Sequence, residues 1–401
     1  MNKEEAVSYI RNRIYRYIDV DNECTDEYIR ERISREIHLF SKDNIISVNN
    51  KDYISKRVFD SIRGLDVLEE FLRDDCITEI MVNGTDNLFI EKLGSLYQSD
   101  SCFEDEKRLN DTAMRIASRS NRIVNAKNPI LDTVLDDGSR VCVVLSPVSK
   151  NGTSITIRKF YDNPLTMEDL INGGTISEEA ADYLINAVKQ KKNIFMSGGT
   201  GSGKTTLLGI LGNYIDEDER VVTIEDSAEL NLSKIKNWVR LETRGSNTSG
   251  DGEITIRRLI KTALRMRPDR LIVGEVRGDE AIDMLQALNT GHAGSLSTGH
   301  ANSSKDMISR LETMVLYGLD IPIQAIRGQI ASALDIIVHL SRMKDKSRKV
   351  IEISEITGMD NGNIVMEPVY LFEGDVKGGK AVGELKNVQK RYFRKRVYKA
   401  L

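Results

Sequence analysis

The chain has 401 residues, more than one ordinary domain, so we expect two or three domains that each bury a core. A hydrophobic fraction of 40% and a charged fraction of 29% are typical of a globular protein. No apolar run reaches the roughly 18 residues that a membrane span requires. The net charge of -4 excludes a protein that coats nucleic acid through charge alone.

The first residues and the cysteines indicate the compartment. Residues 1–5 are charged and lead into a helical pattern without an apolar signal segment, so we expect a cytoplasmic protein. The four cysteines, Cys24, Cys76, Cys102 and Cys142, stand singly with no CxxC pair. This spacing argues against a disulfide framework and against a zinc site, and it predicts ordinary buried thiols.

The first sixty residues have the pattern of a small helical unit. Apolar side chains recur at helical spacing through residues 3–18, and the same period returns through residues 29–40. We therefore predict a helical N-terminal extension over residues 1–60.

Residues 61–160 have the pattern of an α+β domain. The strict apolar–polar alternation of residues 154–160 predicts a half-buried strand that ends this domain. A helix is predicted at 109–124, and short apolar runs before turn residues predict strands at 79–82, 88–90 and 140–144.

A linker at residues 161–166 separates this domain from the rest of the chain. Residues 161–164 break the strand pattern, and Thr166 with Asp169 resembles a capping box that opens a helix. Strand-like and helix-like runs alternate over residues 167–345, which is typical of a sheet covered by helices. A C-terminal β segment and a basic tail are predicted for residues 346–401.

The tail is basic from Lys386 to Lys399 and also contains Tyr392, Phe393 and Tyr398. It is interpreted either as a solvated helix end or as a helix that docks on an anionic membrane surface. No recognition module accompanies it, so we expect no nucleic-acid partner.

The strongest chemical signal is a phosphate-binding loop between a strand-like run at 194–196 and a helix-like run. Glycines let the backbone curl so that several N–H groups point at one phosphate, and the helix adds the positive end of its dipole. Lys204 is expected to neutralise the β and γ phosphates, and the Thr205 hydroxyl to bind Mg²⁺. The predicted nucleotide-binding residues of this loop are Gly198, Gly199, Thr200, Gly201, Ser202, Gly203, Lys204, Thr205 and Thr206.

Acidic residues follow two strand-like runs. Glu225 and Asp226 follow the run at 221–224, and Glu275 follows the run at 271–273 after one glycine. In a doubly wound sheet, a carboxylate at the carboxyl end of a strand faces the ligand crevice, where a base that orients water must lie. We predict Glu275 as that base and Glu225 as a second catalytic candidate. The predicted Mg²⁺ ligands are Thr205, Asp226 and Glu275.

An ordered series of motifs continues from the loop to residue 312. It includes Thr-Ile-Glu-Asp at 223–226, Arg-Pro-Asp at 267–269, Gly-Glu at 274–275, Gly-His-Ala-Gly at 291–294, His-Ala-Asn at 300–302 and Arg-Leu-Glu at 310–312. With these motifs, residues 60–360 resemble the secretion ATPase superfamily that powers type II and type IV secretion and type IV pili. They are most similar to the CpaF-like branch that serves tight-adherence pili.

The resemblance implies an α/β fold: a RecA-like P-loop motor domain preceded by an α+β (PAS-like) N-terminal domain and a short helical extension. It implies ATP and Mg²⁺ as cofactors, and a homo-hexamer that works with an inner-membrane platform protein at the inner face of the cytoplasmic membrane. It also assigns Glu225, Asp226 and Glu229 to an acidic box, and Glu275 to an atypical Walker B element.

The resemblance places His292 and His300 in a histidine box. His300 directly follows a strand-like run and is expected to sense the γ phosphate, whereas His292 is either a nucleotide ligand or a hydrogen-bonded structural residue. Gly299 departs from the pattern of the branch, and we expect it to loosen the approach of His300.

Arg140 and Arg158 of the N-terminal domain are further catalytic candidates. Phosphoryl transfer spreads charge over the equatorial oxygens, which a guanidinium can meet with two hydrogen bonds. The resemblance adds weight to these two arginines, because related motors close their N-terminal domain over the nucleotide.

The predicted function is an ATP-hydrolysing hexameric motor for assembly of a tight-adherence pilus or for type II-like secretion. A type IV secretion motor shares this chemistry and remains open, as does a nucleic-acid translocase. A GTPase switch is disfavoured, because the chain contains no Asn-Lys-x-Asp or Thr-Lys-x-Asp motif.

Overall fold

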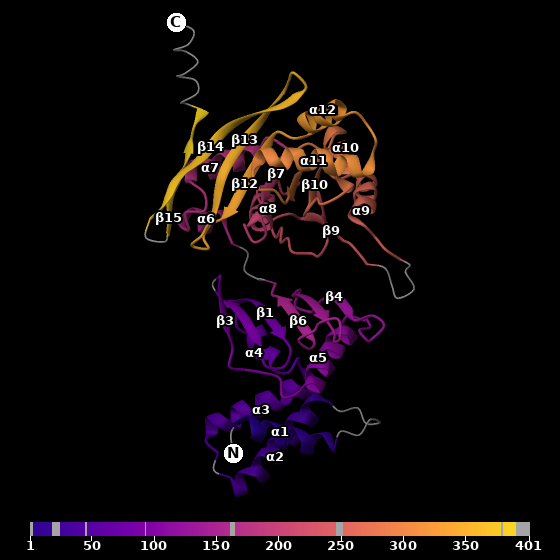
Figure 1. Ribbon diagram of the computed structural model, residues 1–401, viewed down its shortest axis with the longest axis vertical. Coiled ribbons are helices and arrows are strands. Elements are labelled where there is room, and N and C mark those ends of the chain that lie inside the picture. Colours follow the sequence, from indigo (N-terminus) through magenta and orange to yellow (C-terminus); the bar gives the residue numbers. More distant parts are fainter. Residues whose placement is uncertain are drawn as a thin grey trace. The chain divides into compact units, whose positions relative to one another are not determined.

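The computed structural model describes residues 3–17, 25–44, 46–92, 94–160, 165–245, 252–377 and 380–389 (Figure 1). The chain divides into two compact units, Met1–Tyr161 and Asp162–Leu401. The first unit contains both the helical extension and the α+β domain, and the second contains the motor domain and the C-terminal β segment. The finer boundaries at 60 and 345 and the linker at 161–166 remain predictions, and residues 161–164 lie outside the described residues.

Three helices form the first part of the first unit: α1 (Lys3–Tyr15), α2 (Asp26–Asp43) and α3 (Val48–Arg63). The side chains of Thr25 and Ser47 cap α2 and α3 by accepting hydrogen bonds from the first helical turn. The apolar stripes of the helices face one another, and Ile10, Ile33 and Val58 are fully buried in their shared core.

An antiparallel sheet in the order β3-β2-β1-β6-β5-β4 forms the second part. Its strands are β1 (Ile77–Asn83), β2 (Leu88–Lys92), β3 (Ser95–Gln98), β4 (Ile130–Val134), β5 (Arg140–Val144) and β6 (Ser154–Arg158). Ile80, Val141 and Ile157 are buried in the core that the sheet shares with α4 (Leu68–Leu72) and α5 (Glu106–Arg119). Exposure alternates along β6, which confirms the predicted half-buried strand.

Helix α5 ends earlier than the sequence pattern predicts. Asn121 adopts a left-handed φ of 52°, and the N–H of Arg122 donates to the carbonyl oxygen of Ala117 at 2.8 Å. This hydrogen bond is that of a Schellman C-cap, which turns the chain out of the helix. The apolar residues that follow therefore belong to a loop and not to a longer helix.

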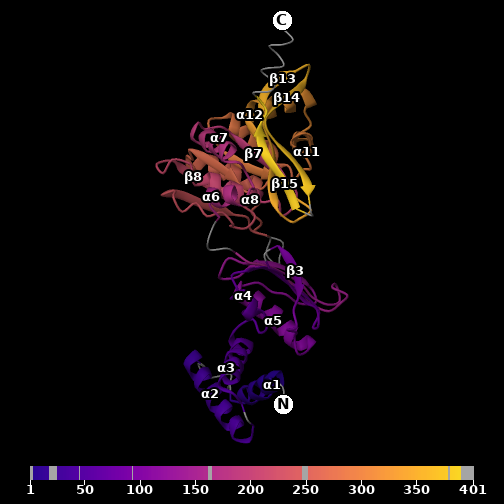
Figure 2. The same cartoon turned by 90° about the vertical axis from the view of Figure 1, so that its left-hand side faces the viewer.

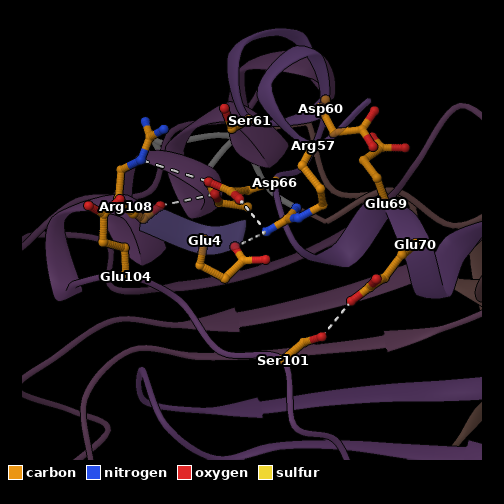
Figure 3. Close-up of polar contacts among 12 residues, drawn as sticks. Glu4, Arg57, Asp60, Ser61, Asp66, Glu69, Glu70, Ser101, Glu104 and Arg108 are labelled. Atoms are coloured by element: carbon orange, nitrogen blue, oxygen red, sulfur yellow. Dashed lines mark hydrogen bonds and ion pairs between the residues drawn. The ribbon is translucent and has the colours of Figure 1, made fainter. Parts of the chain in front are cut away.

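Ion pairs join the three helices to the sheet domain within the first unit (Figure 3). Asp66 lies between Arg57, at 3.5 Å, and Arg108, at 3.8 Å. On α1, Arg11 pairs with Glu104. Because Arg11, Arg57 and Asp66 are buried, removing one partner would leave a buried charge uncompensated.

The second unit is built on a sheet in the order β15-β14-β13-β12-β7-β11-β10-β8-β9. Neighbouring strands from β12 to β9 pair in parallel, and β13, β14 and β15 continue the sheet as antiparallel strands (Figure 2). The bounds are β7 (Ile194–Gly198), β8 (Arg220–Glu225), β9 (Asn237–Glu242), β10 (Arg270–Val273), β11 (Leu296–Gly299), β12 (Ile336–Arg342), β13 (Arg348–Asp360), β14 (Asn363–Lys377) and β15 (Lys380–Asn387).

Helices cover both faces of this sheet. One apolar core includes α6 (Met167–Asn172), α7 (Glu178–Lys189) and α8 (Lys204–Gly212); the other includes α9 (Ile256–Ala263), α10 (Glu280–Asn289), α11 (Ser304–Gly318) and α12 (Ile323–Ala333). Met196 and its neighbour Phe195 on β7 belong to opposite cores, because successive side chains of a strand point to opposite faces. This architecture confirms the predicted α/β fold class, and the capping box of Thr166 and Asp169 is confirmed at the start of α6.

The tail and the cysteines fall partly outside the described residues. Residues 390–401 are not described, so both interpretations of the basic tail stay open. Within the described ranges, no helix is long and apolar enough to cross a membrane. Cys76 and Cys102 are exposed, so the prediction of buried thiols is wrong for these two. Cys24 lies outside the described residues.

Glu104→Gln is expected to destabilise the first unit by about 1 kcal/mol at neutral pH. The amide removes the anion that faces buried Arg11, but the Glu104 side chain is 44% exposed, so solvent screens the pair. Burial raises the pKa of Glu104, yet hydrogen bonds from Ser8 and Arg11 hold it below its ordinary value.

A carboxyl whose folded pKa is lowered stabilises above its unfolded pKa of about 4.3 and loses this effect as the pH falls through the folded value. Thermal melting should therefore separate Glu104→Gln from wild type at pH 7 and bring the two together near pH 3. The exposed carboxylate Glu31 on α2 supplies the control Glu31→Gln. Equal melting of all three proteins at pH 7 would contradict the role of this ion pair.

Candidate active site

The phosphate loop leaves the carboxyl end of β7, a strand with β11 on one side and β12 on the other. Every residue of β7 is buried. Gly201 and Gly203 have left-handed φ values of 68° and 98°, which residues with side chains rarely adopt. These two glycines let the loop curl, so that successive N–H groups turn toward one point.

Lys204 opens α8 and reaches back across the loop. Its Nζ donates to the carbonyl oxygens of Gly198 at 3.1 Å and Gly199 at 2.9 Å. The residue is only 7% exposed, and neutral carbonyls compensate an ammonium charge only in part. Ser202 Oγ is also buried and has no hydrogen-bond partner among the described residues. The loop thus offers a buried cation and an unused hydroxyl, a donor set that suits a phosphate.

Glu275 and His300 lie beside Lys204, from strands far apart in the sequence. His300 follows β11, and its Nδ1 lies 3.5 Å from Lys204 Nζ. Its Nε2 lies 2.8 Å from Glu275 Oε1, a buried oxygen that accepts no aligned hydrogen bond from the described residues. Burial and the charge of Lys204 lower the pKa of His300, so the imidazole is neutral at pH 7.

Arg277 joins the two acids that we predicted as Mg²⁺ ligands. Its Nη2 lies 2.6 Å from Glu275 Oε2, and its Nη1 lies 3.0 Å from Asp226 Oδ2. Burial would raise the pKa of Glu275, but the hydrogen bond and charge of Arg277, with the nearby His300 and Lys204, hold it below its ordinary value. Glu275 is therefore an anion at neutral pH, and one of its oxygens is engaged by Arg277.

Glu225 uses one carboxylate oxygen to hold the backbone that follows β8. Its Oε1 accepts hydrogen bonds from the N–H groups of Glu229 at 2.9 Å and Leu230 at 3.0 Å. A Cβ at position 274 would lie 3.1 Å from Glu225 Cγ, so Gly274 leaves room for this side chain. Burial raises the pKa of Glu225 to about 7, although the two N–H groups act in the opposite direction. Glu225 therefore stabilises the backbone after β8, and its predicted catalytic role stays a prediction.

The structure gives Gly299 a packing role, and the expectation that it loosens the approach of His300 without abolishing it stays a prediction. A Cβ at position 299 would lie 3.0 Å from Phe195 Cε1 and 3.1 Å from Met307 Sδ. The glycine is therefore required by close packing of β11 against its neighbours, and His300 still approaches Lys204.

The structure does not bring His292 to the phosphate loop. β11 runs parallel to β7 with Leu296 opposite Ile194, so residue 292 lies before the amino ends of both strands. The loop lies at their carboxyl ends. His292 Nδ1 lies 3.1 Å from the carbonyl oxygen of Ala287 in α10. This placement favours the structural interpretation of His292 over nucleotide binding.

Arg140 and Arg158 lie side by side in the first unit. They are direct partners in the register of β5 and β6, so both side chains leave the same face of the sheet. The next residues, Val141 and Ile157, are buried on the other face. Two guanidiniums therefore stand together on the sheet face that is turned away from the apolar core.

Three residues near the loop were missed by sequence reasoning: His339, Arg342 and Arg348. His339 Nδ1 lies 3.2 Å from Ser197 Oγ, and Arg348 Nε donates to the carbonyl oxygen of Gly201 at 3.0 Å. They come from β12 and β13, and the sequence gives no sign that β12 is the neighbour of β7. The basic run at 342–349 was the only available signal, and it also suits a solvated turn.

A hollow of about 480 Å³ opens beside the loop. It is lined by residues of the loop, of the end of β11 and of one face of α11, among them Gly199, Thr200, His300, Asn302, Asp306 and Arg310.

Thr205 is half-buried at the start of α8, and Thr206 beside it is exposed. In the described part of the chain, no three His, Cys, Asp or Glu side chains are arranged to hold a metal ion.

Glu225→Gln is expected to stabilise the second unit at pH 8. A carboxyl whose folded pKa is raised stabilises below its unfolded pKa, and this contribution is lost as the pH rises through the folded value of about 7. Wild type should lose roughly 2–3 kcal/mol between pH 4.5 and 8 from this group. The glutamine retains an oxygen that can accept from the same two N–H groups, so the variant should lack this loss.

Thermal melting at pH 5 and pH 8 measures the difference between the two proteins. The matched control is Glu242→Gln, which changes the exposed register partner of Glu225 on β9. If Glu225→Gln keeps the pH dependence of wild type, Glu225 does not carry a buried charge at pH 8.

Comparison with known proteins gives the family. The family described as type II/IV secretion system protein matches residues 62–390. The conjugal transfer protein TrbB of Rhizobium radiobacter is 33% identical over 310 residues, covering 76% of this chain and 91% of that protein. The type IV secretion system protein VirB11 of Bartonella henselae is 31% identical over 326 residues, covering 72% and 91%.

A solved structure shares the fold. The ATPase DotB of Legionella pneumophila gives a TM-score of 0.52 at 21% identity, covering 71% of this chain and 78% of that chain. The family match reaches from α3 through the phosphate loop and the antiparallel extension of the sheet. The chain therefore belongs to the type II/IV secretion system protein family and is a nucleotide-binding ATPase.

Proposed function

We propose that the chain is the ATP-driven motor of a type IV secretion machine. The observation that carries this proposal is the cluster of Lys204, Glu275 and His300 at the phosphate loop of a chain in this family. The two relatives are named for conjugal transfer and type IV secretion, and they favour this function over the tight-adherence pilus motor that we predicted. Pilus assembly or type II-like secretion is the second candidate, because the matching family covers type II and type IV systems.

The loop binds the triphosphate of ATP. Its inward N–H groups and the dipole of α8 meet the α and β phosphates, while Lys204 exchanges its contacts with Gly198 and Gly199 for phosphate oxygens. Thr205 would hold Mg²⁺ through its hydroxyl, and the ion would supply neutralising charge to the triphosphate. Asp226 and Glu275 support it only if Arg277 releases them, because both are paired with that guanidinium.

Glu275 orients and deprotonates the attacking water. Oε1 is the oxygen for this task, because Arg277 engages Oε2 and the described residues give Oε1 no aligned hydrogen bond. Neutral His300 lies between this oxygen and Lys204, so it can contact both the water and the γ phosphate. The lowered pKa of Glu275 keeps the base ionised at neutral pH.

Arg140 and Arg158 complete the site by movement of the N-terminal domain. The two residues leave the same face of neighbouring strands, so both guanidiniums can be delivered together to a polyphosphate. Arginine delivered in this way stabilises the charge that spreads over the γ-phosphoryl oxygens.

The assembly and the location follow from the family resemblance. Six copies would form a ring and transmit domain movement to a platform protein of the inner membrane. The chain would work in the cytoplasm, peripheral to the inner face of the cytoplasmic membrane. No nucleic acid is required for this activity.

Lys204→Ala and Glu275→Gln are expected to separate nucleotide binding from hydrolysis. Lys204→Ala removes the charge that faces the phosphates and should weaken both ATP binding and turnover. Glu275→Gln removes the base while keeping size and polarity, so it should bind ATP like wild type and lose turnover by 100-fold or more, the order of a general-base contribution (~10²–10⁴). Steady-state ATPase rates and equilibrium nucleotide binding of purified protein measure both.

Normal turnover of Lys204→Ala would refute the site, and equal loss of binding in Glu275→Gln would give Glu275 a structural or metal-supporting role. ATP turnover that requires added single-stranded DNA would favour the translocase. In the source cell, Glu275→Gln should block export of protein or DNA, whereas a pilus motor would lose surface fibres and keep export.

Arg158→Ala is expected to lower kcat by roughly 10-fold or more with a smaller change in KM, because its guanidinium acts on transition-state charge. Arg140→Ala should behave similarly. The control is Lys150→Ala, which removes an exposed positive charge from a loop of the same unit. If both arginine variants hydrolyse ATP at the wild-type rate, the domain-closure mechanism must be abandoned.

A further inference from the structure

The hairpin of β12 and β13 forms one wall of the phosphate loop. β12 pairs in parallel with β7, with Leu340 opposite Gly198, so its last residues run beside the loop. The chain then turns, and Arg348 at the start of β13 is the direct partner of Arg342 at the end of β12. Both arginines therefore leave the same face of the hairpin.

This face is turned toward the loop. Arg348 Nε donates to the carbonyl oxygen of Gly201 at 3.0 Å. A Cβ at position 203 would lie 3.5 Å from Arg348 Cδ, and one at position 201 would lie 3.7 Å from Arg342 Nη1. Arg348 thus lies along the outer side of the loop, with its stem against one glycine and its Nε on the carbonyl of another.

The contact fixes the direction of one N–H group. In a trans peptide unit, the C=O and the following N–H point in opposite directions. Because Arg348 holds the Gly201 carbonyl outward, the N–H of Ser202 points into the loop, where it donates to the carbonyl oxygen of Gly199 at 3.4 Å. A carbonyl turned inward instead would oppose a phosphate, so the orientation of this peptide decides whether the loop attracts or repels the anion.

We propose that Arg348 is a positioning residue of the nucleotide site, which presets the peptide of Gly201 and Ser202 for the phosphates that ATP and ADP share. This inference rests on the proposed binding of nucleotide at the loop. Arg348 acts through the hydrogen bond from its Nε and not through the charge of its guanidinium. Because both nucleotides use the same part of the loop, the contribution is equal in the ground state and the transition state.

The test compares Arg348→Ala with Arg348→Gln. Glutamine carries Nε2 on Cδ, where arginine carries Nε, so it keeps a donor at the same place and removes the charge. Lys344→Ala is the control for loss of charge from the same hairpin, since Lys344 is exposed on its turn. KM for ATP, kcat and the dissociation constant for ADP are measured for each variant, and thermal melting checks that each is folded.

Arg348→Ala should raise KM for ATP and the dissociation constant for ADP together by about tenfold, the order expected for the loss of one hydrogen bond, with kcat within about twofold of wild type. Arg348→Gln and Lys344→Ala should stay near wild type. The inference is overturned if Arg348→Ala binds ADP normally, or if Arg348→Gln is as weak as Arg348→Ala. If either result is found while Lys204→Ala is inactive, only the role of Arg348 is refuted. If Lys204→Ala turns over ATP normally, the assignment of the nucleotide site itself is refuted.

Discussion

Parallel pairing of the strands around β7 is the constraint on which the site depends. Because β12, β7, β11, β10 and β8 run in the same direction, their carboxyl ends meet at one edge of the sheet. Lys204, Glu275 and His300 come from three of these ends and meet without any close relation in the sequence. The two apolar cores pack against the strands from both faces and hold the strand ends in place.

Features that depend on neighbouring residues in the sequence, such as the phosphate loop and the capping box, could be predicted from the sequence. Glycines followed by lysine and threonine predict a phosphate loop because only such a backbone can form it, and the capping box at Thr166 depends on neighbours in the same turn. The end of α5 could not be predicted, because the left-handed Asn121 interrupts a helical pattern that its apolar neighbours continue. Arg348 was missed for another reason: only the pairing of β12 with β7 brings its hairpin to the loop.

The direction of β11 says more than residue type about which histidine lies at the phosphate loop. Both histidines stand beside glycines in similar local sequences, yet β11 places one before its amino end and the other after its carboxyl end. Only the carboxyl end meets the phosphate loop, so His300 reaches Lys204 and His292 does not. The sequence favoured His300 because it follows a strand-like run, but the parallel register of β11 and β7 was needed to place His292 away from the loop.

The two glutamates at neighbouring strand ends carry opposite pKa shifts, and this difference separates their roles. Burial of Glu225 outweighs the opposing effects of its backbone N–H partners and of the Arg240 charge, so its pKa rises to about 7. Glu275 is also buried, but Arg277, His300 and Lys204 lie near it and hold its pKa below the ordinary value. A carboxyl that is half protonated near pH 7 is a poor permanent anion beside a polyphosphate, and its N–H partners suit a structural acceptor. A carboxylate that stays ionised among cations can accept the proton of a bound water, which supports the proposal that Glu275 is the base and that Glu225 holds the backbone after β8.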